Sequence, residues 1–513
     1  MRRLSIDKTL IDKAIENVAP GWAAKRYQRR YAIAMAESYT AGSRKRSSMA
    51  GWNPMGSDAD TDILHDLPTM RNRSRDLNRN SPLARAVTNT KVTNVVGYGL
   101  TLKCQIDRTI LGLSEDEADE WERRTEAEWR LFSESKYCDI SGAQNFRGLQ
   151  ALTLRSVLEN GDLGSLLTHK RNARSPYSLR IQQIEADRIS NKDNTADNDK
   201  LAGGVLTNEH GEVIEYHVLD GHPGNLFAKG NEWRKIKPYR DNGLPNMLLH
   251  FNKIRVGQRR GVPDLAPVIE TIKQITRYTE AEVMAAVVQS FFTIFIKSND
   301  PDGLGFDTGA GGSSQDGDDY KMGYGNMIDL NPDEDVSFAD PNRPNKQFDA
   351  FLNSLAGLVG AAVEIPREIL MKHFTSSYSA SRAALLEAWR FFIGQRRWLA
   401  DTLCNPVYEV FMFEAVSLGR IYAPGFLTGD PLIRQAWLGA EWTGQSRGMI
   451  DEEKEINAAE KRIELGVTTL SEETASMTGG DWEKKHPQRV KEFKRRLKDG
   501  LELPLDQIQE FRR

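Results

Sequence analysis

Three histidines come closest, by type and spacing, to a metal-binding set. His210, His217 and His222 are separated by seven and five residues, in a segment that we expect to form strands. Protein zinc sites usually draw on cysteine, histidine and carboxylate ligands at short, characteristic spacings. Neither a cysteine nor a cluster of carboxylates completes this set, so we predict no metal ion and no cofactor.

A second group of chemically capable residues lies in an acidic, glycine-rich stretch within residues 298–345. Asp316, Asp318 and Asp319 have the oxygen ligands that calcium prefers, but no twelve-residue loop here ends in a ligating glutamate. The glycines match neither a phosphate-binding loop nor a dinucleotide fingerprint, because no Lys-Ser/Thr pair follows them. We interpret the stretch as a small acidic excursion, with short strands at 326–330 and 335–339.

The sequence contains no familiar hydrolase or oxidoreductase motif. GxSxG, HExxH, P-loop and CxxC patterns are absent, as is an acidic cluster spaced for two metal ions. Cys104, Cys138 and Cys404 are too far apart to indicate a zinc ribbon or a disulfide framework. We therefore predict that the protein is not an enzyme, while a hydrolase assembled from distant residues stays open as an alternative.

Composition and charge narrow the class of protein further. The chain has 513 residues and a net charge of −3, so we expect more than one domain and no general affinity for polyanions. Its most apolar run, residues 283–296, is too short and too polar to span a membrane. Basic residues concentrate in residues 1–60, which we interpret either as an arm for nucleic acid or an acidic partner, or as a solvated surface helix with a tether.

The longest element that the sequence predicts is one continuous helix over residues 264–297. Asp264 is suited to cap its start, and Pro267 lies in the first turn, where proline is tolerated. From Val283 onward the helix is apolar on nearly every side, so this half must be buried in a large core or against copies of itself. The apolar residues in question are Val283, Val287, Val288, Phe291, Phe292 and Phe295.

Shorter elements surround this helix. A capping box of Ser114 and Glu117 marks one helix start, and Pro82 and Pro406 predict breaks. Alternating apolar residues predict a β-rich module at about 161–255. Further helices are expected over residues 67–95, 115–132, 146–160, 346–364 and 379–403, and the charged block 450–513 is expected to contain several helices.

Several short boxes follow one another in a fixed order along the chain. The first boxes are Arg73-Ser74-Arg75-Asp76-Leu77, Asn80-Ser81-Pro82 and Asn94-Val95-Val96-Gly97-Tyr98-Gly99. The central ones are His250-Phe251, Arg255-Val256-Gly257-Gln258 and Arg260-Gly261-Val262-Pro263. The last are Ser377-Tyr378-Ser379-Ala380-Ser381-Arg382, Glu387-Ala388-Trp389-Arg390, Ile450-Asp451 and Glu453-Lys454-Glu455. In this order, over roughly residues 65–500, the chain resembles the lambda-type family of bacteriophage portal proteins.

The resemblance implies an α+β, mostly helical fold, namely a portal-type ring subunit with wing, stem, clip and crown regions. Residues 1–60 would be a basic arm and linker, 61–263 the wing, and 264–297 the stem helix. Residues 298–345 would form the clip, 346–364 the returning stem helix, and 365–378 a loop that lines the tunnel. Residues 379–449 would be a long kinked helix and wing, and 450–513 a helical crown.

The resemblance also implies a function. A ring, usually of twelve subunits, would sit at one capsid vertex of the virion after assembly in the host cytoplasm, with no membrane involved. Double-stranded DNA would pass through it during packaging and ejection. Its other partners would be the terminase large subunit, head-completion or adaptor proteins, and the major capsid and scaffold proteins.

Three groups of residues would carry these roles. The apolar residues of the stem helix named above would form the subunit interface. Tunnel-loop candidates are Lys372, His373, Phe374, Thr375, Ser376 and Ser377. Clip candidates for docking the motor are Asp302, Asp307, Asp316, Asp318, Asp319 and Tyr320.

Two other classes of protein remain open from the sequence. One is a DNA-binding structural scaffold that acts through the basic N-terminal arm, where Lys25, Arg26, Arg29 and Arg30 fall on one predicted helix. The other is a phage-borne hydrolase whose site the sequence does not reveal. Salt-sensitive DNA binding that is lost on deleting residues 1–51 would favour the scaffold, whereas a closed oligomer would favour the portal.

Overall fold

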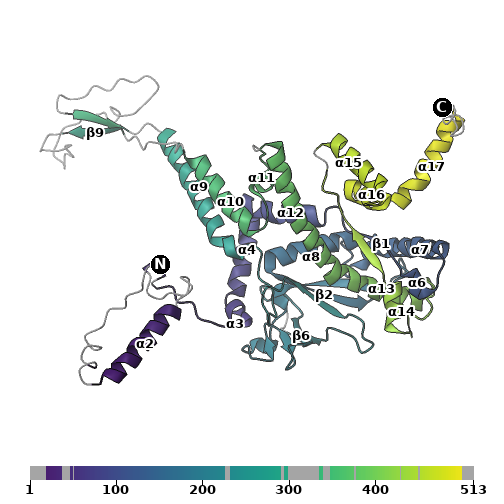
Figure 1. Ribbon diagram of the computed structural model, residues 1–513, viewed down its shortest axis with the longest axis horizontal. Helices are drawn as coiled ribbons and strands as arrows, with labels where there is room; N and C mark the ends of the chain where they lie inside the picture. Colours follow the sequence, from purple (N-terminus) through teal and green to yellow (C-terminus); the bar gives the residue numbers. More distant parts are fainter. Residues whose placement is uncertain are drawn as a thin grey trace, which may run out of the picture. The chain divides into compact units, whose positions relative to one another are not determined.

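A computed structural model describes residues 15, 19–36, 47–49, 51–225, 232–290, 294–298, 334–338, 347–374, 377–427, 429–448 and 451–499 (Figure 1). The chain divides into two compact units, residues 1–58 and 59–513. In the first unit, the described elements include helix α2 (Pro20–Ala36) and a 3-10 turn at Ser47–Met49. The remaining elements belong to the second unit.

The second unit begins with helices whose ends follow local sequence signals. Ser81 separates α4 (Leu67–Asn80) from α5 (Pro82–Val95) and accepts a hydrogen bond from the Ala84 amide, so the break expected at Pro82 is confirmed. The Ser114–Glu117 capping box is formed at the start of α7. The helices of this region are α3 (Ala59–Leu64), α4, α5, α6 (Arg108–Leu111), α7 (Glu115–Ser133) and α8 (Phe146–Asn160).

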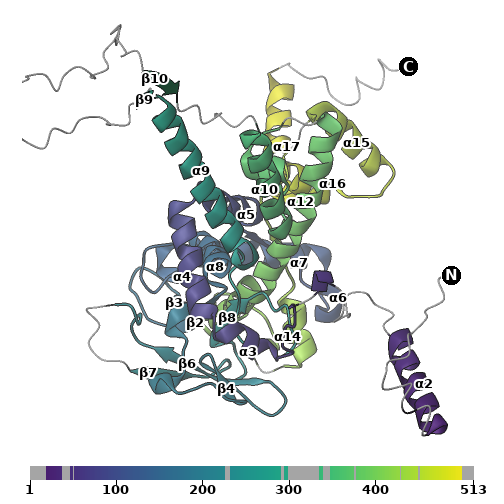
Figure 2. The same ribbon diagram turned by 90° about the vertical axis from the view of Figure 1, so that its left-hand side faces the viewer.

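Two antiparallel sheets form the β-rich module, as the alternating sequence predicts (Figure 2). The first has the order β3-β2-β8, from β2 (Asp162–His169), β3 (Leu179–Glu185) and β8 (Met247–Phe251). The second has the order β4-β5-β6-β7, from β4 (Leu201–Ala202), β5 (Val205–Thr207), β6 (Val213–Leu219) and β7 (Trp233–Ile236). Separately, β1 (Thr101–Cys104) pairs with β11 (Ala440–Thr443).

The long helix is shorter than the sequence predicted. After a 3-10 turn at Ala266–Val268, α9 runs from Ile269 to Ser290, and Ile294–Ser298 then forms strand β9 against β10 (Glu334–Phe338). The prediction of a helix to Lys297 was therefore wrong, because the aromatic and β-branched run around residues 292–296 favours a strand. The strand expected at 335–339 is present as β10, and the one expected at 326–330 lies outside the described residues.

Two of the predicted boundaries after the hairpin also need correction. The expected loop 365–378 contains a short helix, α11 (Arg367–Met371). Pro406 does not break the following helix, because a π-helical turn at Ala400–Cys404 joins α12 to α13 and Pro406 occupies the first turn of α13. The helices here are α10 (Phe348–Ala362), α11, α12 (Tyr378–Leu399), α13 (Asn405–Ser417) and α14 (Pro431–Trp437).

Three helices close the described chain: α15 (Glu452–Glu464), α16 (Leu470–Thr478) and α17 (Trp482–Lys498). Little apolar surface is buried among them. Of the described residues 451–499, the buried side chains are Glu455, Ala459 and Glu473. In the part of the chain that the structure covers, we find no helix with the length and apolar character of a membrane span.

The principal core lies between α7, α8 and α13. Trp129 occupies its centre, with its ring within 5.1–5.6 Å of the rings of Phe146, Tyr408, Phe411 and Trp442. A second core surrounds the start of α9, where apolar residues of α4, α5 and α10 cover the helix. The buried residues of this second core are Leu77, Ala84, Val87, Leu265, Val268, Ile272, Ile275, Val359, Val363, Ile365 and Leu370.

Candidate functional site

The segment that leads into α9 is fixed by a buried carboxylate. Asp162, at the start of β2, is fully buried and accepts hydrogen bonds from Arg71 of α4 at 3.0 Å and from Arg260 at 2.7 and 2.9 Å. Burial alone would raise the pKa of Asp162, but the two guanidinium groups outweigh it and the pKa is lowered. Burial also lowers the pKa of Arg71 to about 10, with partial compensation from Asp162. The carboxylate therefore stays ionised and holds three segments together.

Backbone contacts complete this junction. The amide of Gly261 donates to Asp162 at 3.0 Å. A Cβ atom on Gly261 would lie only 1.9 Å from the carbonyl oxygen of Gly161, so no larger residue fits there without a backbone shift. Arg260 also donates to three carbonyl oxygens at 2.5–2.8 Å, those of Ala186 and Ile189, which are buried, and that of Gly203, which is half-buried. Arg260 is thus nearly saturated with acceptors, as a buried guanidinium requires.

A second ion pair secures the start of α9 itself. Both oxygens of Asp264 lie 2.8 Å from Nζ of Lys91 on α5, and Lys91 is buried. The prediction that Asp264 caps the helix was wrong: Leu265 holds the cap position and no side chain caps it. The junction was not predicted from the sequence pattern, because its ion-paired residues are 91 to 173 positions apart in the chain. The one local signal was Asp162 itself, a charge at the head of an apolar strand.

Towards its C-terminal end, α9 carries apolar side chains that the rest of the described chain leaves exposed. Val283, Met284 and Val287 are 57%, 61% and 44% exposed. On the neighbouring helix α10, Phe351 and Leu358 are 48% and 64% exposed. The core of the chain therefore does not enclose these residues, and apolar side chains are left exposed on both helices.

An apolar groove of about 730 Å³ lies beside this surface. Its walls come from α9, α10, α11 and the start of α5. The apolar lining residues are Pro82, Leu83, Ala86, Ile275, Val283, Met284, Leu352, Ala356, Leu370 and Met371. We call this groove, together with the exposed residues of α9 and α10, the stem surface.

The predicted interface residues are only partly visible in this surface. Val283 and Val287 are exposed on α9 and contribute to it. The side chains of Val288, Phe291, Phe292 and Phe295 lie outside what the structure describes, so their role stays a prediction. The clip candidates Asp302, Asp307, Asp316, Asp318, Asp319 and Tyr320 also lie outside the described residues.

The tunnel-loop candidates surround the end of α11. Lys372 closes that helix in the left-handed conformation (φ 53°), and its amide donates to Glu368. Lys372, His373 and Phe374 are exposed. Ser377 accepts a hydrogen bond from the Ala380 amide and so caps α12. Thr375 and Ser376 lie outside the described residues.

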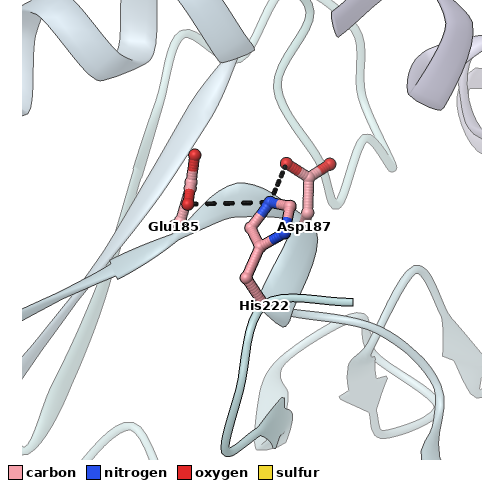
Figure 3. A group of neighbouring side chains, drawn as sticks. All are labelled: Glu185, Asp187 and His222. Atoms are coloured by element: carbon pink, nitrogen blue, oxygen red, sulfur yellow. Dashed lines mark ion pairs between the residues drawn. The ribbon is translucent and has the colours of Figure 1, made fainter. Parts of the chain in front are cut away.

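The three histidines have separate partners. His217 is buried and contacts Glu215 at 3.1 Å, whereas His210 is exposed beside Glu209. His222 lies 3.7 Å from Glu185 and 3.4 Å from Asp187, and the three side chains point toward one another (Figure 3).

Arginine neutralises this acidic pair. Arg75 of α4 bonds to Asp187 and lies 3.6 Å from Glu185. Burial would raise the pKa of Asp187, but the Arg75 hydrogen bond and charge lower it. The arrangement is an ion-pair network that attaches α4 to the end of β3, and so extends the Asp162 junction.

Known proteins share this chain's sequence pattern. Residues 45–396 match the family model described as "Phage portal protein, lambda family". The chain is 25% identical to portal protein B of Escherichia phage lambda over 485 residues, 90% of each chain. It is also 25% identical to the portal protein of Escherichia phage N15, over 89% of each chain.

A third relative and two solved structures extend the comparison. The probable portal protein of Halomonas phage phiHAP-1 is 24% identical, over 84% of this chain and 80% of its own. A chain of the "Virion of native gene transfer agent (GTA) particle" aligns over 74% of this chain and 94% of its own, with 12% identity and a TM-score of 0.41. A chain of the "Neck of empty GTA particle computed with C6 symmetry" aligns over 83% and 96%, with 11% identity and a TM-score of 0.44.

The family model covers more than half of the chain and includes the Asp162 junction, α9 and α10. The match confirms the resemblance carried by the sequence boxes. The chain therefore belongs to the lambda family of phage portal proteins.

Proposed function

We propose that the chain assembles with copies of itself into a closed ring at a capsid vertex, and that double-stranded DNA passes through the ring during packaging and ejection. The observation that carries this proposal is the stem surface, because apolar side chains of α9, one of the two longest helices that the structure describes, are exposed where a neighbouring subunit of a ring would cover them. Val283 and Met284 are more than half exposed. Covering exposed apolar side chains such as these is a principal source of the free energy of association between protein subunits.

Ring closure requires two different complementary faces on each subunit. The apolar groove between α5, α9, α10 and α11 is concave and supplies one face. The exposed apolar side chains of α9 and α10 that do not line the groove, including Leu358 at 64% exposure, would supply the other. The charge junction at Asp162 fixes the base of α9, so both faces are presented at a defined angle.

The remaining partners follow from family membership. We propose that residues 298–345 dock the terminase large subunit and later the head-completion proteins. The flanking regions would contact the major capsid and scaffold proteins, and residues 372–377 would lie near the tunnel. In this role the chain is a structural protein of the virion rather than an enzyme, and it assembles in the host cytoplasm.

The mass and shape of the purified protein test the ring directly. Twelve copies of a 57.8 kDa chain give about 690 kDa by light scattering. Averaged electron micrographs along the axis should show a closed ring with a central hole wide enough for a DNA duplex. A protein that stays monomeric at high concentration, or an oligomer without a hole, would contradict the proposal.

A further inference from the structure

Helix α17 carries a concentrated positive charge. Residues 482–498 contain eight lysines and arginines and two glutamates, a formal charge of +6, in a chain whose total is −3. The rest of the chain therefore carries −9. All seventeen residues of α17 are described, and none has a buried side chain. The positive charge of α17 is therefore concentrated on one solvent-exposed helix, where it can act on a ligand although the chain as a whole is slightly negative.

Five of the eight basic residues gather on one side of the helix, while Lys485, Arg489 and Arg496 lie on a flank beside its apolar side. At 100° per residue, Lys484, Lys491, Lys494, Arg495 and Lys498 share one side. The opposite side carries Trp482, His486, Val490, Phe493 and Leu497. On that side Trp482 and Leu497 are half-buried, whereas Val490 and Phe493 are exposed, at 36% and 39%, and the Trp482 ring stacks on His486 of the same helix at 4.7 Å.

Ion pairs fix the start of this helix. Lys484 lies 3.1 Å from Glu126 on α7, and Lys103 on β1 lies 3.1 Å from Glu483. Asp481 caps the helix by accepting from the Glu483 amide. These contacts use the first turn and leave the later basic residues exposed. Among the described residues, no ion pair joins Lys491, Lys494 or Lys498 to a carboxylate.

We propose that the basic side of α17 binds the phosphate backbone of double-stranded DNA. Lys491 and Lys498 are about 10 Å apart along the helix axis, and duplex DNA carries about one charge per 1.7 Å, so several phosphates lie within reach. The choice of DNA as the polyanion rests on the proposed function, whereas the positive charge of α17 is a feature of the sequence and structure that does not depend on it. The helix lies outside residues 45–396, so the family match does not account for it.

DNA fits this surface better than an anionic membrane does. An interfacial helix must insert its apolar side into the lipid. The apolar side of α17 spans only about 80° of the helix circumference, includes His486, and is half-buried at Trp482 and Leu497. A phosphate backbone needs only the basic side, where Lys491, Lys494 and Lys498 are exposed. In a ring, each subunit would contribute one such row, so that weak contacts add along the DNA.

The test compares two full-length variants with matched changes of charge. In the first, Lys491→Gln, Lys494→Gln and Lys498→Gln remove three charges from α17 while keeping good helix formers. In the second, Lys25→Gln, Arg26→Gln and Arg29→Gln remove three from α2. Binding of a fluorescent 30-base-pair duplex of arbitrary sequence is measured over a series of NaCl concentrations.

The α17 variant should bind the duplex at least about tenfold more weakly, and the slope of log K against log salt should fall by about 2–3 for each helix engaged. The α2 variant should bind as the unmodified protein does. Equal affinity and slope for the α17 variant and the unmodified protein would overturn the proposal, as would a loss confined to the α2 variant.

Two further measurements separate this proposal from its alternatives. The unmodified protein and the α17 variant should sediment equally little with vesicles of phosphatidylserine and phosphatidylcholine. If the α17 variant loses vesicle binding but keeps DNA binding, the proposal is refuted. Light scattering reports ring assembly independently. If the unmodified protein forms rings but the α17 variant binds DNA as tightly as the unmodified protein does, this inference alone is refuted. If the unmodified protein does not form rings, the proposed function is refuted.

Discussion

At the scale of single residues, Asp162 fixes the segment from which α9 leaves the body of the chain. It pairs with Arg71 and Arg260, which come from segments 91 and 98 residues away, and it accepts from the Gly261 amide. Removing one partner of a buried charge group leaves the others uncompensated. Removing the Asp162 carboxylate should therefore lower the free energy of unfolding by more than the intact group, after its desolvation cost, contributes to it.

Asp162→Asn should lower the free energy of unfolding by about 3–5 kcal/mol, because two buried guanidinium groups lose their counter-charge. Urea denaturation followed by circular dichroism measures this change. The control is Asp220→Asn, which removes a carboxylate about half exposed beside Arg234 and should cost less than about 1 kcal/mol. Equal effects for the two substitutions would show that the junction is not a buried charge group.

The same residue predicts a pH dependence. The pKa of Asp162 is lowered in the folded chain relative to about 3.9 in an unfolded one. The carboxylate's contribution to stability is therefore complete above about pH 4 and is lost as the pH falls through the folded pKa. Denaturation between pH 2 and pH 7 should show a smaller acid-induced loss of stability for Asp162→Asn than for the unmodified protein.

Val283 tests the stem surface at the same scale. Val283→Glu should leave the subunit folded, because that side chain is 57% exposed, but should prevent ring formation, because assembly would desolvate the charge. Light scattering gives the oligomeric mass, and thermal melting checks the fold. Lys273→Glu, on an exposed position of the same helix, is the matched control and should assemble normally. Normal rings from Val283→Glu would mean that this part of α9 is not an interface.

At the scale of elements, sequence signals located starts and breaks better than ends. Ser81, Pro82 and the Ser114–Glu117 box act through local hydrogen bonds, so the sequence alone places them. The end of α9 was misplaced because a run that is apolar on every side has no period to separate a helix from a strand. The aromatic and β-branched run at residues 292–296 was the available signal. Helix α11 was missed because five residues carry too little pattern.

Two glycines of α10 give a matched prediction for this element. A Cβ on Gly360 would lie 2.5 Å from the Ile365 carbonyl oxygen, whereas a Cβ on Gly357 meets nothing within 4 Å. Gly357→Ala should therefore stabilise the subunit by about 0.5–1 kcal/mol, and Gly360→Ala should destabilise it. Thermal denaturation of the subunit measures both. If Gly357→Ala stabilises the subunit but blocks the ring, a neighbouring copy packs closely at that glycine.

At the scale of the whole molecule, α15–α17 are attached differently from the rest. Their links to the body include the ion pairs Lys103–Glu483, Lys484–Glu126 and Arg447–Glu455. Of the residues described after Trp442, none belongs to the three large apolar clusters. One partner of each pair is at least 39% exposed, so salt still screens these pairs, whereas it does not weaken apolar burial. The C-terminal helices and the body should thus respond differently to ionic strength.

Raising NaCl from about 0.1 to about 1 M shortens the Debye length from about 10 to about 3 Å. Hydrogen exchange measured by mass spectrometry should then speed up in α15 and α17 and stay unchanged in β2 and β3. Lys103→Gln should produce part of the same effect at low salt. Uniform exchange rates across both regions would show that apolar contacts hold the C-terminal helices.

The family and the general order of elements could be predicted from the sequence, but the candidate site only in part. Residues such as Val283 and Val287 could be proposed from the sequence, because a helix end without a polar side must be buried against something. The groove was not, because it depends on how α5, α9, α10 and α11 come together. The Asp162 junction was also missed, since nothing local distinguishes a buried arginine such as Arg260 from an exposed one.

The hairpin of β9 and β10 has a consequence for how this family can diversify. Five paired residues hold the two ends of the intervening segment one strand spacing apart, from Glu334 opposite Ser298 to Phe338 opposite Ile294. Closing a longer loop between fixed ends adds only about 0.6 kcal/mol for each doubling of its length. Insertions, deletions or wholesale exchange of residues 299–333 between related phages should therefore leave the helices beneath undisturbed, so that this portion can evolve with whichever partner it meets.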